Sequence, residues 1–192
     1  LFVDWYLPAV SGRPTPAEVA NDFVARWRQV LPLARRASDT LVLRDYHVDN
    51  LMWLPGRSGA AACGLLDFQD AVIGPPAYDL VSLLEDARRD VPATLARAEI
   101  ARYLAAFPET DAEAFMTAYA VLGATRNAKI IGIFTRLMAR DGKPRYLAHI
   151  PRVWRLLEGD LAHPALTFVR EWFDRHAPRN LRVVPAVKAP DP

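Results

Sequence analysis

Residues 41–78 constrain the fold of this chain more than any other stretch, because two short apolar runs there each end in carboxylates. Leu41-Val42-Leu43 leads into Asp45, and Gly64-Leu65-Leu66 leads into Asp67. Short apolar runs of this kind are typical of buried strands, and polar residues just past a strand end lie where a fold exposes its chemistry. The stretch therefore predicts two strands whose ends present acids.

The residues between these acids predict a β-hairpin. Leu51–Leu54 and Ala61–Phe68 have strand character and flank a turn at Pro55-Gly56. Positions at equal distances back from one turn meet in an antiparallel pair. We therefore expect Asn50 and Asp67 to lie together at one end of the hairpin.

The spacing of the polar residues matches a phosphoryl-transfer site. Asp45 and Asn50 form an Asp-x-x-x-x-Asn pattern, and Asp67 follows at the end of the next strand. In such sites one carboxylate accepts the proton of the attacking hydroxyl, while an amide and a second carboxylate hold Mg²⁺ against the phosphates.

Composition narrows the classes of partner and compartment. The formal net charge of +2 is too small to indicate a nucleic-acid-binding protein, and the basic residues are interspersed with acids. No run approaches the roughly 18 apolar residues that a membrane span needs. The single cysteine, Cys63, lies in an apolar segment, which predicts a small core residue and excludes a disulfide framework. We therefore expect a cytoplasmic protein with no nucleic acid and no membrane as partner.

The remainder of the chain predicts helices. After Gly74-Pro75-Pro76 the apolar residues follow helical periodicity. Two segments, Thr15–Glu18 and Thr110–Glu113, have the pattern of a capping box in which the threonine caps the helix. The tail is rich in proline and charge and has no amphipathic period. The fold class is thus α+β and predominantly α-helical, with a body over residues 1–178 and a flexible C-terminal arm over 179–192.

Three segments resemble the motifs of the aminoglycoside phosphotransferase and choline kinase family, which is related to the protein kinases. LRDYHVDN over 43–50 resembles the catalytic loop, LLDF over 65–68 the metal-binding segment, and GPPAYDL over 74–80 the start of the next helix. RDGKPRYLAHIPRVWRLLE over 140–158 is similar to the anomeric sugar kinases that phosphorylate N-acetylmuramate and N-acetylglucosamine in cell-wall recycling. The resemblance implies the C-terminal lobe of a protein-kinase-like fold, with a small hairpin that carries the catalytic and metal residues.

The resemblance also implies a role for individual residues. Asp45 would be the catalytic base, with Asn50 and Asp67 as Mg²⁺ ligands, and His47 and Asp79 would support the loop. ATP and Mg²⁺ are the implied cofactors, and a small-molecule acceptor, most simply an amino sugar, is the implied partner. Leu43 departs from the family, which usually has histidine there. The candidate acceptor-binding residues are Asp49, Gln69, Asp70, Arg136 and Trp154.

The sequence lacks the features of the family's N-terminal, ATP-binding lobe. It contains no Gly-x-Gly-x-x-Gly pattern, and none of its lysines lies on a candidate N-terminal strand. We therefore expect the C-terminal lobe alone, with the ATP lobe absent, and a chain that by itself is a poor or inactive kinase although its parent protein is a kinase. Such a lobe would expose an apolar face that packs on the missing lobe or on another copy of the chain.

Three alternatives remain open at the level of sequence. An aminoglycoside, choline or another small alcohol could be the acceptor, because one scaffold serves many substrates. Alternating Asp45, His47 and Asp49 also fit a metallohydrolase, although Asn50 and Asp67 would then have no role. A third reading is a non-catalytic binding or regulatory lobe. A preference for Mg²⁺ with nucleotide over Zn²⁺ or Mn²⁺ alone would distinguish the kinase from the hydrolase.

Overall fold

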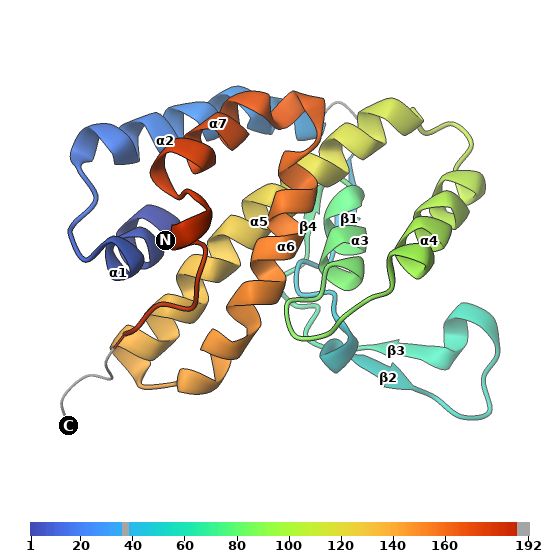
Figure 1. Ribbon diagram of the computed structural model, residues 1–192. Helices are drawn as coiled ribbons and strands as arrows, with labels where there is room; N and C mark the ends of the chain where they lie inside the picture. The colour runs from blue at the N-terminus through green and yellow to red at the C-terminus, as the bar shows by residue number, and fades with distance from the viewer. Residues whose placement is uncertain (36–38, 188–192) are drawn as a thin grey trace. The chain divides into compact units, whose positions relative to one another are not determined.

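The computed structural model describes residues 1–35 and 39–187 (Figure 1). Residues 188–192, the end of the predicted arm, lie outside this description. The chain divides into two compact units, one formed by residues 1–32 and 120–192 and the other by residues 33–119. It is mostly helical and carries two small antiparallel sheets, which confirms the predicted fold class.

The first unit is built from helices only, within its described residues. A single turn of π-helix (Phe2–Tyr6) precedes α1, and helices α2 and α7 pack against each other (Figure 1). Short 3-10 segments precede α6 and α7 and follow α7. The bounds of the helices are α1 (Leu7–Ser11), α2 (Ala17–Val30), α6 (Ile150–Leu161) and α7 (Thr167–His176), together with the larger part of α5 (Ala112–Asp141).

An aromatic cluster forms the core of the first unit. The Phe2 ring lies 5.1 Å from the rings of both Tyr6 and Phe173, measured between centroids. Phe23 of α2 lies 4.6 Å from Trp172 of α7. These rings are buried or half-buried, and edge-to-face contacts between them add to the free energy gained from burying their area. The first residues of the chain are therefore part of this core.

A chain of hydrogen bonds crosses this core at Tyr6. The Trp154 indole N–H donates to the Tyr6 hydroxyl at 2.8 Å. The hydroxyl in turn faces the carbonyls of Leu181 and Val183 at 2.7 and 2.8 Å. Because Tyr6 has no exposed surface, each of these polar groups depends on the others for a partner.

The described part of the predicted C-terminal arm is anchored to the first unit. Arg179–Leu181 forms a 3-10 turn, and the Arg182 guanidinium donates to Glu158 and to Asp174, each at 2.7 Å. The guanidinium also lies 5.2 Å from the centre of the Trp154 ring. The sequence pattern did not predict this anchoring, because the contacts come from the single side chain of Arg182 and not from an amphipathic face.

Both threonine caps predicted from the sequence are wrong. The Thr15 hydroxyl donates to the carbonyl of Val3 at 2.6 Å, so α2 begins without a side-chain cap. At α5 the cap is Asp111, whose Oδ1 accepts from the amides of Glu113 and Ala114 at 2.9 and 3.0 Å. A carboxylate at a helix N-terminus also interacts favourably with the helix dipole, which explains why it displaces the preceding threonine.

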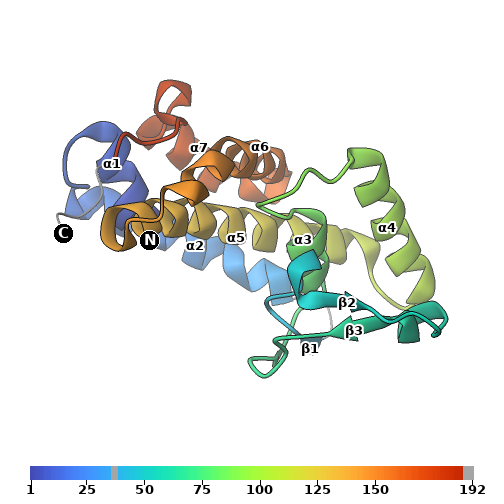
Figure 2. The same cartoon turned by 90° about the horizontal axis from the view of Figure 1, so that it is seen from below.

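The second unit contains both sheets and two further helices. Figure 2 shows the β2–β3 pair of this unit. Strands β2 and β3 pair antiparallel, which confirms the predicted hairpin, and Met52 lies opposite Gly64. The second strand covers only Cys63–Leu65 of the predicted Ala61–Phe68, and Gly59–Ala62 before it forms a 3-10 turn. The sequence did not predict β4, which pairs antiparallel with β1 so that Leu41 faces Ile73. The element bounds are β1 (Thr40–Val42), β2 (Leu51–Trp53), β3 (Cys63–Leu65), β4 (Val72–Gly74), α3 (Ala77–Leu84) and α4 (Ala93–Ala106).

Cys63 is exposed, so its assignment to the core is wrong. It lies opposite Trp53 in the β2–β3 pair, and Trp53 itself is 75% exposed. A two-stranded ribbon has no second layer of its own to bury apolar side chains. None of the helices within residues 1–35 and 39–187 is long and apolar enough to cross a membrane.

The Tyr6 network makes the stability of the fold sensitive to alkaline pH. Burial raises the pKa of Tyr6 from 10.0 to about 12, although its hydrogen bonds oppose the shift. The native state therefore keeps a proton that the unfolded chain releases, and the free energy of unfolding should fall by about 2–3 kcal/mol between about pH 10 and pH 12. Tyr6→Phe should remove this component of the pH dependence. It should also lower stability at neutral pH by about 1–3 kcal/mol, because the Trp154 N–H loses its acceptor.

Urea unfolding of both proteins, measured from pH 7 to pH 11.5, checks this prediction. The quantity of interest is the difference between the two unfolding free energies at each pH, since other groups that titrate in this range contribute equally to both. A difference that does not change with pH would contradict the assignment of the alkaline transition to Tyr6.

Candidate active site

The loop with the predicted base runs between β1 and β2, and α3 holds its first residues. The Asp79 carboxylate in the first turn of α3 accepts the amide of Leu43 at 2.7 Å and the amide of Arg44 at 3.0 Å. Burial raises the pKa of Asp79, while these two backbone hydrogen bonds act to lower it. Both carboxylate oxygens are thus occupied by main-chain amides, and the loop leaves β1 in one defined conformation.

Asp45 and Asn50 are joined within this loop. The side-chain nitrogen of Asn50 donates to the main-chain carbonyl of Asp45 at 2.9 Å, and the Asn50 amide donates to the carbonyl of His47 at 2.9 Å. The Asp45 side chain is exposed, and within the described residues its carboxylate has no hydrogen bond or ion pair. Asp45 therefore has a fixed main chain and a carboxylate that is available to a substrate. Since the Asn50 nitrogen is used internally, its Oδ1 is the atom left for a cation.

The hairpin brings Asp67 to the same end as Asn50. The β2–β3 register pairs Leu51 with Leu65, and one step further the Leu66 amide donates to the Asn50 carbonyl at 2.9 Å. Asp67 is the next residue, and it is exposed. One amide oxygen and one carboxylate at this end are hard oxygen donors of the kind that Mg²⁺ takes in proteins, alongside water and phosphate oxygens. The residues present therefore fit Mg²⁺ as a cofactor.

Two non-glycine residues of this region have left-handed backbone conformations. They are Arg44 with φ of 71° and Asp67 with φ of 56°. Such conformations cost of order 1–3 kcal/mol each and persist where the surrounding structure imposes them, often at functional sites. One lies next to the predicted base, and the other is a predicted metal ligand. The sequence held no signal for either.

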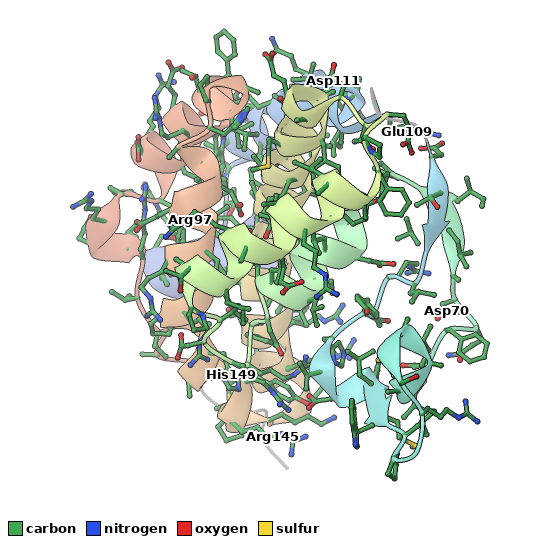
Figure 3. The ribbon with its side chains drawn as sticks, turned by 90° about the vertical axis from the view of Figure 1, so that its right-hand side faces the viewer. Asp70, Arg97, Glu109, Asp111, Arg145 and His149 are labelled. Carbon is green, nitrogen blue, oxygen red and sulfur yellow. The ribbon has the colours of Figure 1, made fainter. Side chains whose placement is uncertain are left out.

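The other predicted residues of the second unit have partners that limit what they can do. Asp49 is paired with the guanidinium of Arg89, and Gln69 donates its side-chain amide to Asp67. Asp70 extends from the loop before β4 with its side chain exposed (Figure 3). Within the described part of the chain, the Nδ1 of His47 is buried and has no hydrogen bond, so the loop support predicted for His47 does not run through this nitrogen.

Arg136 and Trp154 belong to the first unit. Trp154 is 3% exposed, and its N–H is taken by the Tyr6 hydroxyl, so its surroundings are those of a core residue. Arg136 lies on α5, half-buried, and its buried Nε has no hydrogen bond within the described residues.

The residues that would have formed a metallohydrolase site do not assemble. Asp45, His47 and Asp49 alternate in sequence, but no group of three or more histidine, cysteine or acidic side chains in residues 1–35 and 39–187 could hold a metal ion. The side-chain oxygens of Asn50 and Asp67 suit a hard cation better than the Asp45, His47 and Asp49 set does.

Comparison with known proteins identifies the family of the chain. The sequence profile of the phosphotransferase enzyme family (APH) matches residues 1–116. The N-acetylmuramate/N-acetylglucosamine kinase of Caulobacter vibrioides is 45% identical over 95% of this chain and 50% of its own length. The kinases of the same name from Pseudomonas aeruginosa and Neisseria meningitidis are 38% and 36% identical, over 84% and 79% of this chain.

The chain spans about half the length of these curated relatives, 50% of the first and 48% and 46% of the other two. The profile match covers more than half of the chain, and it includes the β1–β2 loop, the hairpin and the start of α3. The three segments that resemble the family's motifs, over 43–50, 65–68 and 74–80, lie within the matched residues, and the segment over 140–158 lies outside them. The chain belongs to the phosphotransferase enzyme family.

Proposed function

We propose that the protein carrying this chain is an ATP- and Mg²⁺-dependent small-molecule kinase that phosphorylates the anomeric hydroxyl of N-acetylmuramate or N-acetylglucosamine, in cell-wall recycling. Family membership supports the reaction class, and the names of the related kinases support the acceptors. The observation that carries the proposal is the geometry of the loop. The Asp45 carboxylate is exposed and has no hydrogen bond or ion pair within the described residues. Asp79 and Asn50 hold the main chain of its loop in place.

Asp45 is the base in this proposal. Its exposed carboxylate would accept the proton of the acceptor hydroxyl while that oxygen bonds to the γ-phosphorus, the bond from this phosphorus to the bridging oxygen breaks, and ADP leaves. An anomeric hydroxyl is more acidic than an ordinary alcohol, so a carboxylate acts here through its position more than through its basicity. The Asn50 and Asp79 contacts reduce the freedom of the main chain on either side of Asp45, which favours a reactive geometry.

Asn50 and Asp67 are the proposed Mg²⁺ ligands. When bound with nucleotide, the ion neutralises the charge of the transferring phosphoryl group. The Asn50 nitrogen that holds the Asp45 carbonyl also fixes the side-chain amide, so that Oδ1 is the oxygen left for the ion. Gln69 donates to one oxygen of Asp67, which leaves the other for coordination.

We further propose that residues 1–178 form the C-terminal lobe and that a nucleotide lobe completes the site. Exposed apolar side chains on the two sheets support this idea. Leu41 and Ile73, which face each other across β1 and β4, are 60% and 70% exposed, and Trp53 on the hairpin is 75% exposed. Apolar surface of this kind marks a face that another part of the protein or a second copy covers. The present chain alone would then be a poor kinase.

A phosphate-transfer screen of the full-length protein tests the function. Mg-ATP is offered with N-acetylmuramate, N-acetylglucosamine, choline or an aminoglycoside, and this chain is assayed in parallel. We expect turnover on the N-acetyl sugars by the full-length protein only. Turnover on another acceptor would keep the mechanism and change the substrate, whereas no turnover on any acceptor would favour a non-catalytic binding module.

Asp45→Asn in the full-length protein should lower kcat by about 10²–10⁴-fold, because the amide cannot accept the hydroxyl proton. Nucleotide binding, measured by calorimetry, should be unchanged. Glu109→Gln is a matched control, since Glu109 is an exposed carboxylate of the same unit outside the site (Figure 3). Full turnover by the Asp45 variant would remove this residue from the role of base.

Asp67→Ala should raise the Mg²⁺ concentration that gives half-maximal rate by at least about tenfold, because the ion loses a charged oxygen ligand. The measurement is a Mg²⁺ titration of the initial rate at saturating acceptor. An unchanged titration curve would exclude Asp67 as a ligand.

A further inference from the structure

Arg44 has a backbone conformation that favours glycine. Its φ of 71° lies in the left-handed region, where a β-carbon meets the neighbouring carbonyl. The Asp79 hydrogen bond to its amide helps to impose this conformation. Glycine would adopt it without strain, so the backbone alone gives no reason for an arginine here. The contacts of the side chain supply one.

The Arg44 side chain forms a hydrogen bond between the two segments just beyond the end of the β1–β4 pair. The last pair of the ladder is Val42 with Val72, and if the ladder continued, positions 44 and 70 would be the next pair on the same face of the sheet. No main-chain bond joins them in the described structure. Instead, Nη1 of Arg44 donates to the main-chain carbonyl of Asp70 at 3.3 Å. The side chain therefore connects the two segments two residues beyond the last pair of strand residues.

The carbonyl that Arg44 holds belongs to the turn that follows Asp67. This turn is closed by the hydrogen bond from the Ala71 amide to the Phe68 carbonyl, at 3.1 Å. Asp67 precedes the turn in its own left-handed conformation and accepts from Gln69 within the turn. One end of Arg44 thus lies in the loop of the predicted base, and the other end contacts the turn of a predicted metal ligand.

We propose that Arg44 is a positioning residue that clamps the Asp67 turn onto the Asp45 loop, so that base and metal ligand keep a fixed separation during phosphoryl transfer. Arg44 acts through the Asp70 carbonyl and contacts no reacting atom. This inference rests on the proposed function, because it assigns Asp45 and Asp67 the roles given above.

The variants Arg44→Gly and Arg44→Lys in the full-length protein test the clamp. We expect the thermal midpoint of Arg44→Gly to equal or exceed that of the wild type, since glycine relieves the left-handed strain. We expect its kcat to fall at least tenfold and its half-saturating Mg²⁺ concentration to rise several-fold. Arg44→Lys keeps the charge with a shorter reach and should give intermediate values. Arg57→Gly, at an exposed arginine of the same unit, should leave the kinetics unchanged.

The direction of the Mg²⁺ shift separates positioning from charge. If Arg44 acted only as a positive charge, its loss would bring the half-saturating Mg²⁺ concentration down, because less repulsion would oppose the cation. A lower value, or a kcat within twofold of the wild type, would overturn the proposal. Should Arg44→Gly fail to fold, Arg44→Lys decides, and full activity of that variant overturns the clamp.

Hydrogen–deuterium exchange gives a readout that does not depend on turnover. In Arg44→Gly the Ala71 amide should exchange faster than in the wild type, because the turn has lost its clamp, while amides of α4 should be unaffected. Equal exchange at Ala71 would overturn the proposal even in an active enzyme. If the wild type is inactive on every acceptor, the proposed function is contradicted. The contact between Arg44 and the turn would still be supported if the Ala71 amide exchanges faster in Arg44→Gly than in the wild type.

Discussion

The candidate site depends on one interaction, in which the Asp79 carboxylate accepts hydrogen bonds from the main-chain amides of Leu43 and Arg44. It joins the first turn of α3 to the end of β1, although these segments are far apart in the sequence. Burial disfavours the carboxylate charge and raises the pKa of Asp79, and the two amides together with the helix N-terminus offset part of that cost. Because Arg44 is held there, Asp45 leaves the strand in a defined direction.

The site separates the groups that hold the main chain from the groups that do the proposed chemistry. Asp79, the Asn50 nitrogen and the Arg44 guanidinium all bind main-chain atoms. The carboxylates of Asp45 and Asp67 are exposed. A carboxylate that is spent on a structural ion pair, as Asp49 is with Arg89, is less available to a substrate or a metal. This contrast argues for Asp45 and Asp67 over Asp49 as the proposed reacting groups.

The parts of the fold that local patterns determine could be predicted from the sequence, and the parts set by distant partners could not. The hairpin followed from the turn between its strands, and most helices followed from periodicity. In contrast, β4 pairs with a distant strand, and the Thr15 hydroxyl binds Val3 instead of capping α2. Trp154 illustrates the same limit, because an aromatic residue on an amphipathic helix fits a core or a binding pocket equally well, and only the Tyr6 contact decides.

The exposed sheets connect the proposed nucleotide lobe to the precision of the site. A two-stranded ribbon is marginally stable in water by itself, yet β1–β4 and β2–β3 carry the loops of Asp45 and Asp67 at their ends. Leu41 and Ile73 have no covering layer within the described residues of their unit. A lobe that buried Leu41 and Ile73 would stabilise the β1–β4 ribbon, and one that also covered Trp53 would stabilise β2–β3, so that the loops at their ends would move less. In the proposed kinase, the second lobe would thus contribute to the geometry of the base and the metal ligands as well as to the binding of ATP.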